Sequence, residues 1–254
     1  MASILKVENL TKKYVSRGRP DVIAVDHICF VMEKGECLGV IGESGSGKST
    51  AASLIARLLD ATEGEIVFDG ENITRLRGRA LKKVYRNIQM VFQIPAESFD
   101  PRLTLGDGIG ESLRNLGMSG NEVREEVGKL LVMCGLDPSF AKRYPHEVSG
   151  GQCQRAAIAR ALAVRPKLLI CDEATSALDV TIQKEIMELI RELQRDRGND
   201  LSILFISHDI ALVQQFCTRV LVMYKGRIVE EGNPDAIIRS PKDAYTKRLI
   251  DSVL

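Results

Sequence analysis

The sequence has no surplus of charge of either sign. Its 254 residues include 35 Lys and Arg and 34 Asp and Glu, which leaves a formal net charge of +1. A protein that holds nucleic acid mainly by neutralising phosphates needs a basic excess. Composition therefore gives no support to a nucleic-acid-binding role, and we expect no nucleic acid among the partners.

Long hydrophobic runs are missing as well, although 44% of the residues are hydrophobic. No apolar stretch approaches the ~20 residues that a membrane-spanning helix needs. Residues 1–15 mix apolar with charged side chains and lack the apolar core and small residues of a secretory signal. We expect a soluble chain, or one attached to a membrane only through a partner.

Paired cysteine motifs are also absent. The six cysteines show no C-x-x-C pair and no metal-ligand spacing, and several lie inside apolar segments that read as strands. We expect reduced, buried thiols in a cytosolic protein. The cysteines are Cys29, Cys37, Cys134, Cys153, Cys171 and Cys217.

What the sequence does contain is a glycine-rich segment of the form G-x-x-x-x-G-K-[ST]. It follows an apolar run at 38–41 and opens a run without Gly or Pro at 50–59, the strand–loop–helix context of a phosphate loop. Lys48 is expected to reach the β- and γ-phosphates of a nucleotide, and Ser49 to ligate Mg²⁺. The alternative is a glycine turn that binds nothing, which the flanking pattern disfavours. The segment consists of Gly42, Glu43, Ser44, Gly45, Ser46, Gly47, Lys48, Ser49 and Thr50.

Polar side chains follow three other apolar strands. Asp172 and Glu173 come directly after the run at 168–171, Gln93 ends the run at 88–92, and His208 follows closely after 203–206. In open α/β sheets, ligands bind beyond the carboxyl ends of the strands. We expect Asp172 to hold the Mg²⁺ water shell and Glu173 to polarise the attacking water as a general base. Gln93 can ligate magnesium or hold the water, and His208 can hydrogen-bond the γ-phosphate. Taken singly, Gln93 and His208 are as readily explained as structural residues.

A second glycine-backed helix start lies at 149–152, formed by Ser149, Gly150, Gly151 and Gln152. With a free serine hydroxyl it predicts a second anion site. One ATP has a single γ-phosphate, so two protomers related by a two-fold axis could each lend this site to the other's nucleotide. Tyr14 can stack on adenine, although a tyrosine at an interface is the default reading.

The alternation of apolar segments predicts an α/β chain with one interruption. Between about 94 and 150 no strand is predicted, so this block reads as a helical insertion. Ser119 is a candidate N-cap there. Strands are predicted at 4–10, 24–32, 38–41, 65–68, 88–92, 167–171, 201–206, 219–224 and 227–230. Helices are predicted at 50–59, 78–86, 104–116, 121–134, 150–163, 181–195, 234–238 and 241–253.

The order of these motifs, together with 176–179, resembles the ATP-binding subunit of ABC transporters over nearly the whole chain. The resemblance implies a RecA-like P-loop core with an antiparallel β subdomain (1–93 and 158–254) and an inserted α-helical subdomain (94–157), forming a single ABC ATPase domain. It makes 42–50 the Walker A motif, Gln93 the Q-loop and 149–152 the family signature. Asp172 and Glu173 become the Walker B aspartate and catalytic glutamate. Asp179 becomes part of the D-loop at a dimer interface, His208 the switch histidine and Tyr14 the adenine-stacking aromatic.

A narrower resemblance is to the oligopeptide, dipeptide and nickel importer group. It rests on the segments at 91–102, 145–152 and 172–183 and on Ala244-Tyr245-Thr246; the chain departs from the group's pattern at Ile94, Asp100, Val148 and Cys153. The resemblance implies ATP and Mg²⁺ as cofactors and a place on the cytoplasmic face of the plasma membrane. The partners it implies are two transmembrane permease subunits, a second ATP-binding subunit in a heterodimer or homodimer, and an extracellular solute-binding protein.

Three alternatives remain open at this point. One is a non-transport ABC ATPase acting on DNA, ribosomes or an assembly complex, although such proteins tend to carry two ATPase units or a long coiled coil, which this chain lacks. A second is the ABC-like subunit of a phosphonate-degrading complex. A third is a module that senses ATP without hydrolysing it, against which Asp172, Glu173 and His208 together argue.

Overall fold

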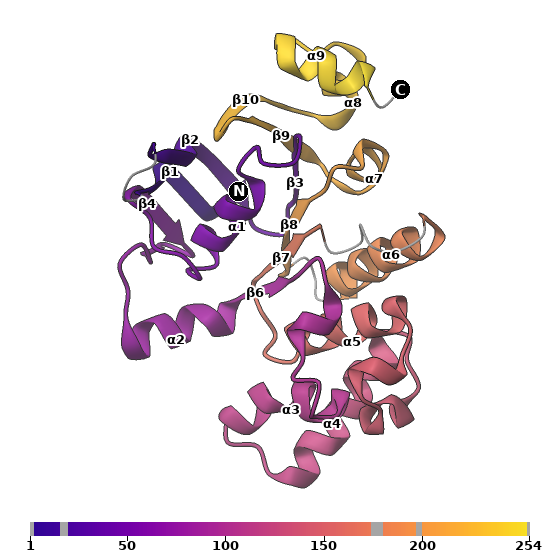
Figure 1. The fold of residues 1–254 in the computed structure, drawn as a ribbon. Coiled ribbons are helices and arrows are strands. Elements are labelled where there is room, and N and C mark those ends of the chain that lie inside the picture. The colour runs from indigo at the N-terminus through magenta and orange to yellow at the C-terminus, as the bar shows by residue number, and fades with distance from the viewer. Residues whose placement is uncertain (1–2, 16–19, 174–179, 197–199, 253–254) are drawn as a thin grey trace.

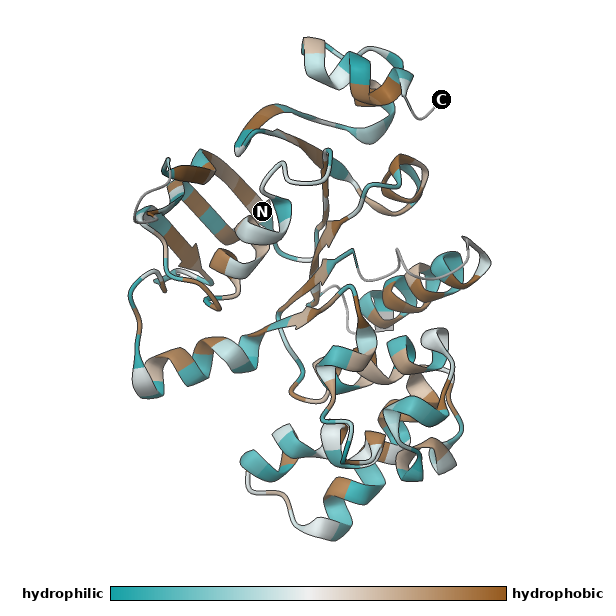
Figure 2. Cartoon of the chain, in the orientation of Figure 1, coloured by the Kyte–Doolittle hydropathy of each residue, from teal (hydrophilic) through white to brown (hydrophobic). Residues whose placement is uncertain are grey.

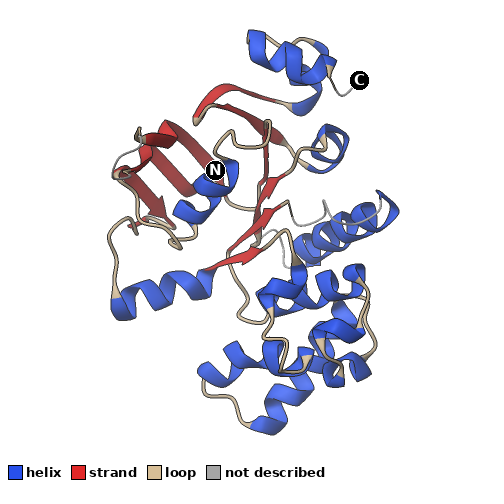
Figure 3. Ribbon diagram, viewed as in Figure 1, coloured by secondary structure: helices blue, strands red, loops and turns tan. Residues whose placement is uncertain are grey.

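The computed structural model describes residues 3–15, 20–173, 180–196 and 200–252 (Figure 1). The described residues form a four-stranded antiparallel sheet and a six-stranded, mostly parallel sheet, with helices packed around them (Figure 3). The antiparallel sheet has the order β2-β1-β4-β5, formed by β1 (Ser3–Tyr14), β2 (Val22–Glu33), β4 (Glu63–Phe68) and β5 (Glu71–Asn72). The larger sheet has the order β10-β9-β3-β8-β7-β6, formed by β3 (Cys37–Ile41), β6 (Ile88–Val91), β7 (Leu168–Asp172), β8 (Ser202–Ile206), β9 (Arg219–Tyr224) and β10 (Arg227–Gly232).

The larger sheet is buried on both faces, as parallel sheets usually are. Its strands are mostly hydrophobic (Figure 2). Because successive side chains of a strand point to opposite faces, the strands divide their apolar residues between two cores. On β8, Leu204 and Ile206 join the core that contains helix α1 (Lys48–Ile55) and the antiparallel sheet. Ile203 and Phe205 join the core on the other face, which contains residues of α5 (Gly150–Leu162), α6 (Val180–Asp196) and α7 (Ile210–Phe216).

The segment between β6 and β7 is helical throughout, which confirms the predicted absence of strands there. Ser119 caps α4 as expected: its backbone N–H donates to Glu122 Oε2 at 2.8 Å and its hydroxyl accepts from the Glu122 N–H at 3.5 Å. The segment contains 3₁₀ turns and helices at Pro95–Ser98, α3 (Leu105–Asn115), α4 (Gly120–Met133), Pro138–Lys142, Pro145–Glu147 and α5.

Several predicted bounds were wrong. The first strand does not turn at Lys12; it continues to Tyr14 because Lys12 to Tyr14 pair with Val22 to Val25 of β2. The prediction also missed α7, whose N-cap is Asp209. The remaining helices are α2 (Gly78–Asn87), α8 (Pro234–Arg239) and α9 (Ala244–Asp251).

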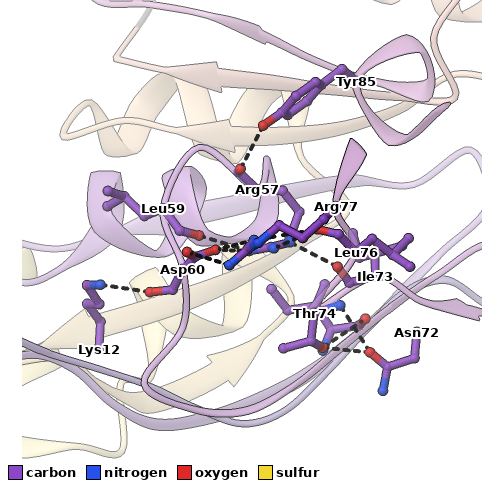
Figure 4. Close-up of polar contacts among 11 residues, drawn as sticks. Lys12, Arg57, Leu59, Asp60, Asn72, Ile73, Thr74, Leu76, Arg77 and Tyr85 are labelled. Carbon is purple, nitrogen blue, oxygen red and sulfur yellow. Dashed lines mark hydrogen bonds and ion pairs between the residues drawn. The ribbon is translucent and has the colours of Figure 1, made fainter. Parts of the chain in front are cut away.

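Helix α1 is shorter than predicted because a buried arginine follows it. Arg57 has a φ of 59°, in the left-handed region that often ends helices. Its guanidinium is buried and donates to the carbonyl oxygens of Ile73 at 2.9 Å, Leu59 at 3.2 Å and Leu76 at 3.4 Å (Figure 4). The Arg57 carbonyl in turn accepts from the hydroxyl of Tyr85 on α2 at 3.0 Å. Arg57 thus joins the end of α1 to the loop after β5 through its side chain and to α2 through its backbone carbonyl.

The cysteines are free thiols, and five of the six are buried. Burial raises the pKa of Cys134 to about 12 and that of Cys153 to about 11, so these thiols stay protonated. The expectation of burial was wrong for Cys29, which is exposed on β2. In the described part of the chain, no helix combines the length and the apolar character needed to cross a membrane.

Candidate active site

The predicted site residues emerge at one edge of the larger sheet. Val40 of β3 lies opposite Ile206 of β8, and Ile206 lies opposite Asp172 of β7. Because these strands are parallel, the segments that follow them leave the sheet side by side. The phosphate loop, Glu173 and His208 therefore share one edge, and Gln93, exposed two residues after β6, lies along it.

Two glycines of the phosphate loop fit between distant parts of the chain. A Cβ on Gly42 (φ 150°) would lie 2.2 Å from the Met223 carbonyl oxygen, and one on Gly47 (φ 104°) would lie 2.3 Å from that of Ala24. Neither distance is compatible with a side chain, so both positions need glycine. The Gly226 N–H also donates to the Ser46 carbonyl at 2.9 Å. The β9–β10 hairpin and β2 thus hold the loop in shape.

Lys48, the first residue of α1, is buried at 4% exposure. Its ammonium donates to the carbonyl oxygens of Gly42 at 2.7 Å and Glu43 at 2.9 Å. Burial lowers the pKa of Lys48, while the nearby charges of Glu173 and Asp172 oppose that change. A partly desolvated cation beside a helix N-terminus is suited to phosphate oxygens.

Ser49 and Asp172 meet across the site. The Ser49 hydroxyl donates to Asp172 Oδ1 at 2.9 Å. Burial raises the pKa of Asp172, although the hydrogen bond from Ser49 acts in the opposite direction. The protein therefore does not fully offset the loss of water around the negative charge of this carboxylate. Hydroxyl and carboxylate oxygens are the ligands that Mg²⁺ takes in phosphate sites. These residues therefore fit a magnesium ion.

Glu173 is held in an unusual backbone conformation. Its φ of 48° lies in the left-handed region, which costs free energy for a residue with a Cβ and is commonest at functional sites. Its N–H donates to the Ile206 carbonyl at 3.0 Å, which ties the residue to β8. His208 Nδ1 lies 3.9 Å from Glu173 Oε2, and the imidazole is largely exposed. The predicted base and the predicted γ-phosphate contact are therefore neighbours.

Tyr14 lies at the end of β1, opposite Val22 and near the strand residue Ala24 that abuts Gly47. The ring is 41% exposed, and the Lys12 ammonium lies 5.2 Å from its centroid. An exposed aromatic face near the phosphate loop is available for stacking on a base. Asp179, the expected D-loop residue, lies outside the described residues.

The segment 149–152 begins α5, but its serine hydroxyl is not free as expected. Ser149 Oγ accepts from the Gln152 N–H at 3.3 Å, and the Ser149 N–H donates to Gln152 Oε1 at 3.0 Å. This capping box still leaves the hydroxyl proton for an anion. A Cβ on Gly151 would lie 3.0 Å from Ile182 of α6. In the part of the chain that the structure describes, residues 149–152 make no hydrogen bond to the phosphate loop at 42–50.

One residue at the site was not assigned a role from the sequence. Tyr245 of α9 accepts a hydrogen bond from the Glu43 N–H at 2.9 Å through its hydroxyl oxygen. In the sequence, this tyrosine is notable only as part of the Ala244-Tyr245-Thr246 segment that resembles the importer group. A buried tyrosine needs a hydrogen-bonding partner, but which partner it finds depends on tertiary structure.

Comparison with known proteins places the chain in a family. The model of a family described as "ABC transporter" matches residues 25–176, more than half of the chain. The glutathione import ATP-binding protein GsiA of Pectobacterium atrosepticum is 45% identical over 98% of this chain and 41% of its own length. The oligopeptide transport ATP-binding protein OppF of Escherichia coli (strain K12) is 47% identical over 91% of this chain and 69% of its own. The chain thus spans about two fifths of the length of the GsiA relatives.

Solved structures agree with this placement. The ATP-binding cassette MJ0796, solved as a dimer in a post-hydrolysis state with ADP and Pi, is 33% identical with a TM-score of 0.83 and covers 91% of this chain and 98% of its own. CbiO1 from Clostridium perfringens, part of the ABC transporter complex cbiONQ, is 32% identical with a TM-score of 0.82, covering 94% of this chain and 91% of its own. The predicted fold class, a P-loop core with an antiparallel β sheet and a helical insertion, is confirmed. The chain belongs to the ABC transporter family.

Proposed function

We propose that this chain is the ATP-hydrolysing subunit of an ABC importer that takes up peptides, with nickel as the second candidate cargo. The observation that carries the proposal is the contact between Ser49 and Asp172 beside the buried Lys48, with Glu173 next along the chain. The relative named for glutathione import supports the direction, and this relative together with the one named for oligopeptide transport supports the cargo class. They also favour a transporter over a phosphonate-degrading or DNA-acting complex.

Each site residue has a task in phosphoryl transfer, which depends mainly on positioning and charge stabilisation. The backbone of Gly42 to Thr50 binds the phosphates of ATP, and Lys48 contacts the β- and γ-phosphates. Ser49, Asp172 and Gln93 would hold Mg²⁺, which supplies positive charge against the phosphate oxygens. Glu173 accepts a proton from the attacking water, and His208 hydrogen-bonds the γ-phosphate. Tyr14 stacks on the adenine.

A second ATPase subunit completes the site. Ser149, Gly150, Gly151 and Gln152 of one protomer contact the nucleotide of the other, with Asp179 at the interface. The lack of a hydrogen bond between 149–152 and the phosphate loop in the described residues supports this arrangement, as does the family relationship to a cassette solved as a dimer. The companion is a different ATPase chain or a second copy of this one.

Two permease subunits anchor the ATPase to the cytoplasmic face of the plasma membrane, and a solute-binding protein delivers cargo on the outside. A groove lined by Ala56, Leu58, Tyr85, Phe92, Ser98 and Arg160 is the proposed docking site for a cytoplasmic segment of a permease. Leu58, Phe92 and the neighbouring Ile94 are exposed apolar residues beside it. We assign 1–93 and 158–254 to the core with its β subdomain, and 94–157 to the helical subdomain.

The test is reconstitution in liposomes with two permeases, the companion ATPase and a solute-binding protein from the same system. We expect ATP-dependent uptake of a labelled tripeptide, none of labelled Ni²⁺, and loss of uptake with Glu173→Gln. Uptake of Ni²⁺ alone would overturn the peptide assignment. ATP hydrolysis by a chain that neither co-purifies with permeases nor supports any uptake would overturn the importer assignment.

A further inference from the structure

One peptide unit of the phosphate loop is hydrogen-bonded on both sides. Its carbonyl, that of Gly42, accepts from the Lys48 ammonium at 2.7 Å. Its N–H, that of Glu43, donates to the hydroxyl oxygen of Tyr245 at 2.9 Å. Because a peptide unit is planar and rigid, the two groups cannot reorient separately. The hydroxyl on α9 therefore acts on the orientation of the carbonyl that holds Lys48.

The position of Tyr245 is set independently of the phosphate loop. The side chain is 4% exposed, and its ring stacks on Tyr224 of β9 with centroids 4.0 Å apart. Asp243 caps α9 by accepting from the Tyr245 N–H at 2.7 Å. The carboxylate of Glu230 on β10 accepts from the N–H groups of Lys242 at 2.9 Å and Asp243 at 3.0 Å. These contacts fix α9 against the β9–β10 hairpin and present the hydroxyl to the loop.

Loss of the hydroxyl would change the loop in a defined way. The Glu43 N–H would lose its protein acceptor, and rotation of the peptide toward another acceptor would turn the Gly42 carbonyl away from Lys48. Hydrogen bonds in series also polarise one another, so the intact chain from Tyr245 to Lys48 is stronger than its separate parts. The hydroxyl favours one arrangement of the lysine before any nucleotide binds.

We propose that Tyr245 is a positioning residue for Lys48, acting through the Gly42–Glu43 peptide, and that α9 is thereby part of the phosphate site. Tyr245 does not itself contact the reacting atoms in this assignment. It orders the lysine that meets the β- and γ-phosphates. The inference rests on the nucleotide-binding part of the proposed function and is independent of the cargo.

The test compares Tyr245→Phe with Tyr224→Phe. Both variants keep the stacked ring pair, but only the first removes the acceptor of the Glu43 N–H. Binding of ATP and of AMP is measured by calorimetry, because AMP carries no β- or γ-phosphate for Lys48 to contact. We expect Tyr245→Phe to weaken ATP binding about 3–10-fold, the effect of one net hydrogen bond, and to leave AMP binding unchanged. Tyr224→Phe is expected to match the wild type for both ligands.

Unchanged ATP affinity in Tyr245→Phe would overturn the inference. Equal losses for ATP and AMP would also overturn it, because they would show a merely structural tyrosine. Should Tyr245→Phe fail to fold, amide hydrogen exchange on the wild-type protein replaces it: protection of the Glu43 N–H supports the contact, and rapid exchange excludes it. A wild-type protein that binds no ATP would instead contradict the proposed function.

Discussion

A buried lysine and a half-buried aspartate, Lys48 and Asp172, place charges of opposite sign at one edge of the larger sheet. Burial lowers the pKa of Lys48 and raises that of Asp172, so each is held where its charged form is disfavoured. A phosphate group beside Lys48 and a cation beside Asp172 would each restore a favourable charge balance. The site is thus organised for ligands of both signs at once.

The general base gives the first prediction. Glu173→Gln keeps the size of the side chain but cannot accept a proton, so turnover should fall about 10²–10⁴-fold, the usual contribution of a general base. ATP affinity should be retained. Steady-state hydrolysis and equilibrium binding measure the two quantities, with the exposed Glu192→Gln on α6 as control. Undiminished turnover would remove Glu173 from this role.

The phosphate-loop lysine gives the second prediction. Lys48→Ala removes hydrogen bonds from a charged donor, so ATP should bind about 10–100-fold more weakly. Calorimetry with ATP provides the measurement. Lys82→Ala, an exposed lysine on α2, is the matched control and should bind as the wild type does. Equal affinities in the two variants would contradict the assignment of the loop.

At the scale of single residues, the sequence predicts the position of a residue better than it predicts which residues it contacts. Asp172 and Glu173 could be placed because an apolar strand ends directly before them. The prediction of a free Ser149 hydroxyl is wrong, because the hydroxyl oxygen accepts from the Gln152 N–H in a capping box. The partner of Tyr245 could not be found, since it lies 202 positions away in the chain and no local pattern joins the two.

Among the elements, the predicted strands of the larger sheet agree with the structure because fully buried strands are continuous apolar runs. Elements that depend on partners were predicted less well. The end of β1 is polar, and only its pairing with β2 makes it a strand. Helix α1 stops at Ile55 because the Arg57 that follows it is anchored by hydrogen bonds to Leu59 and to the loop after β5, which a local pattern does not show.

This arginine is the basis of a stability prediction. Arg57→Ala removes a buried guanidinium and its hydrogen bonds to the carbonyls of Leu59, Ile73 and Leu76, so we expect a loss of about 3 kcal/mol in the free energy of unfolding. Arg77→Ala is the control, because Arg77 binds the same Asp60 but is largely exposed. Its removal should cost less than about 1 kcal/mol. Urea denaturation distinguishes them, and similar losses would show that the buried network contributes little.

The attachment of α9 should depend on pH. Burial and the nearby Asp243 oppose ionisation of Glu230, but the N–H groups of Lys242 and Asp243 outweigh them and lower its pKa. A lowered pKa stabilises the folded state above the unfolded-state value, near 4.3 for glutamate, and this contribution disappears as pH falls through the folded pKa.

Glu230→Gln should therefore cost about 1 kcal/mol at pH 7, the scale of a partly exposed charged hydrogen bond. The difference from the wild type should stay constant down to about pH 4.3 and shrink as the pH falls below that value. Thermal unfolding across that range measures it, and exchange of the α9 amides shows where it acts. A difference independent of pH would contradict the role of the carboxylate.

At the scale of the molecule, each nucleotide site is proposed to need a second subunit. With ATP and Mg²⁺, Glu173→Gln should trap a closed dimer, doubling the mass seen by light scattering, either alone or with the companion ATPase chain. Wild-type activity per subunit should fall on dilution. A permanently monomeric enzyme with full activity at any concentration would refute this view.

Gly42 packs against the carbonyl of Met223, and the Glu43 N–H donates to the hydroxyl of Tyr245. These contacts with late parts of the sequence have a consequence while the protein is being translated. Chains are made from the N-terminus at about 5–20 residues per second, so the glycine segment leaves the ribosome roughly 10 s or more before the hydroxyl it needs. Until Tyr245 has been made and α9 has folded, we expect the glycine segment of a nascent chain to lack this support and to bind ATP several-fold more weakly than in the folded domain.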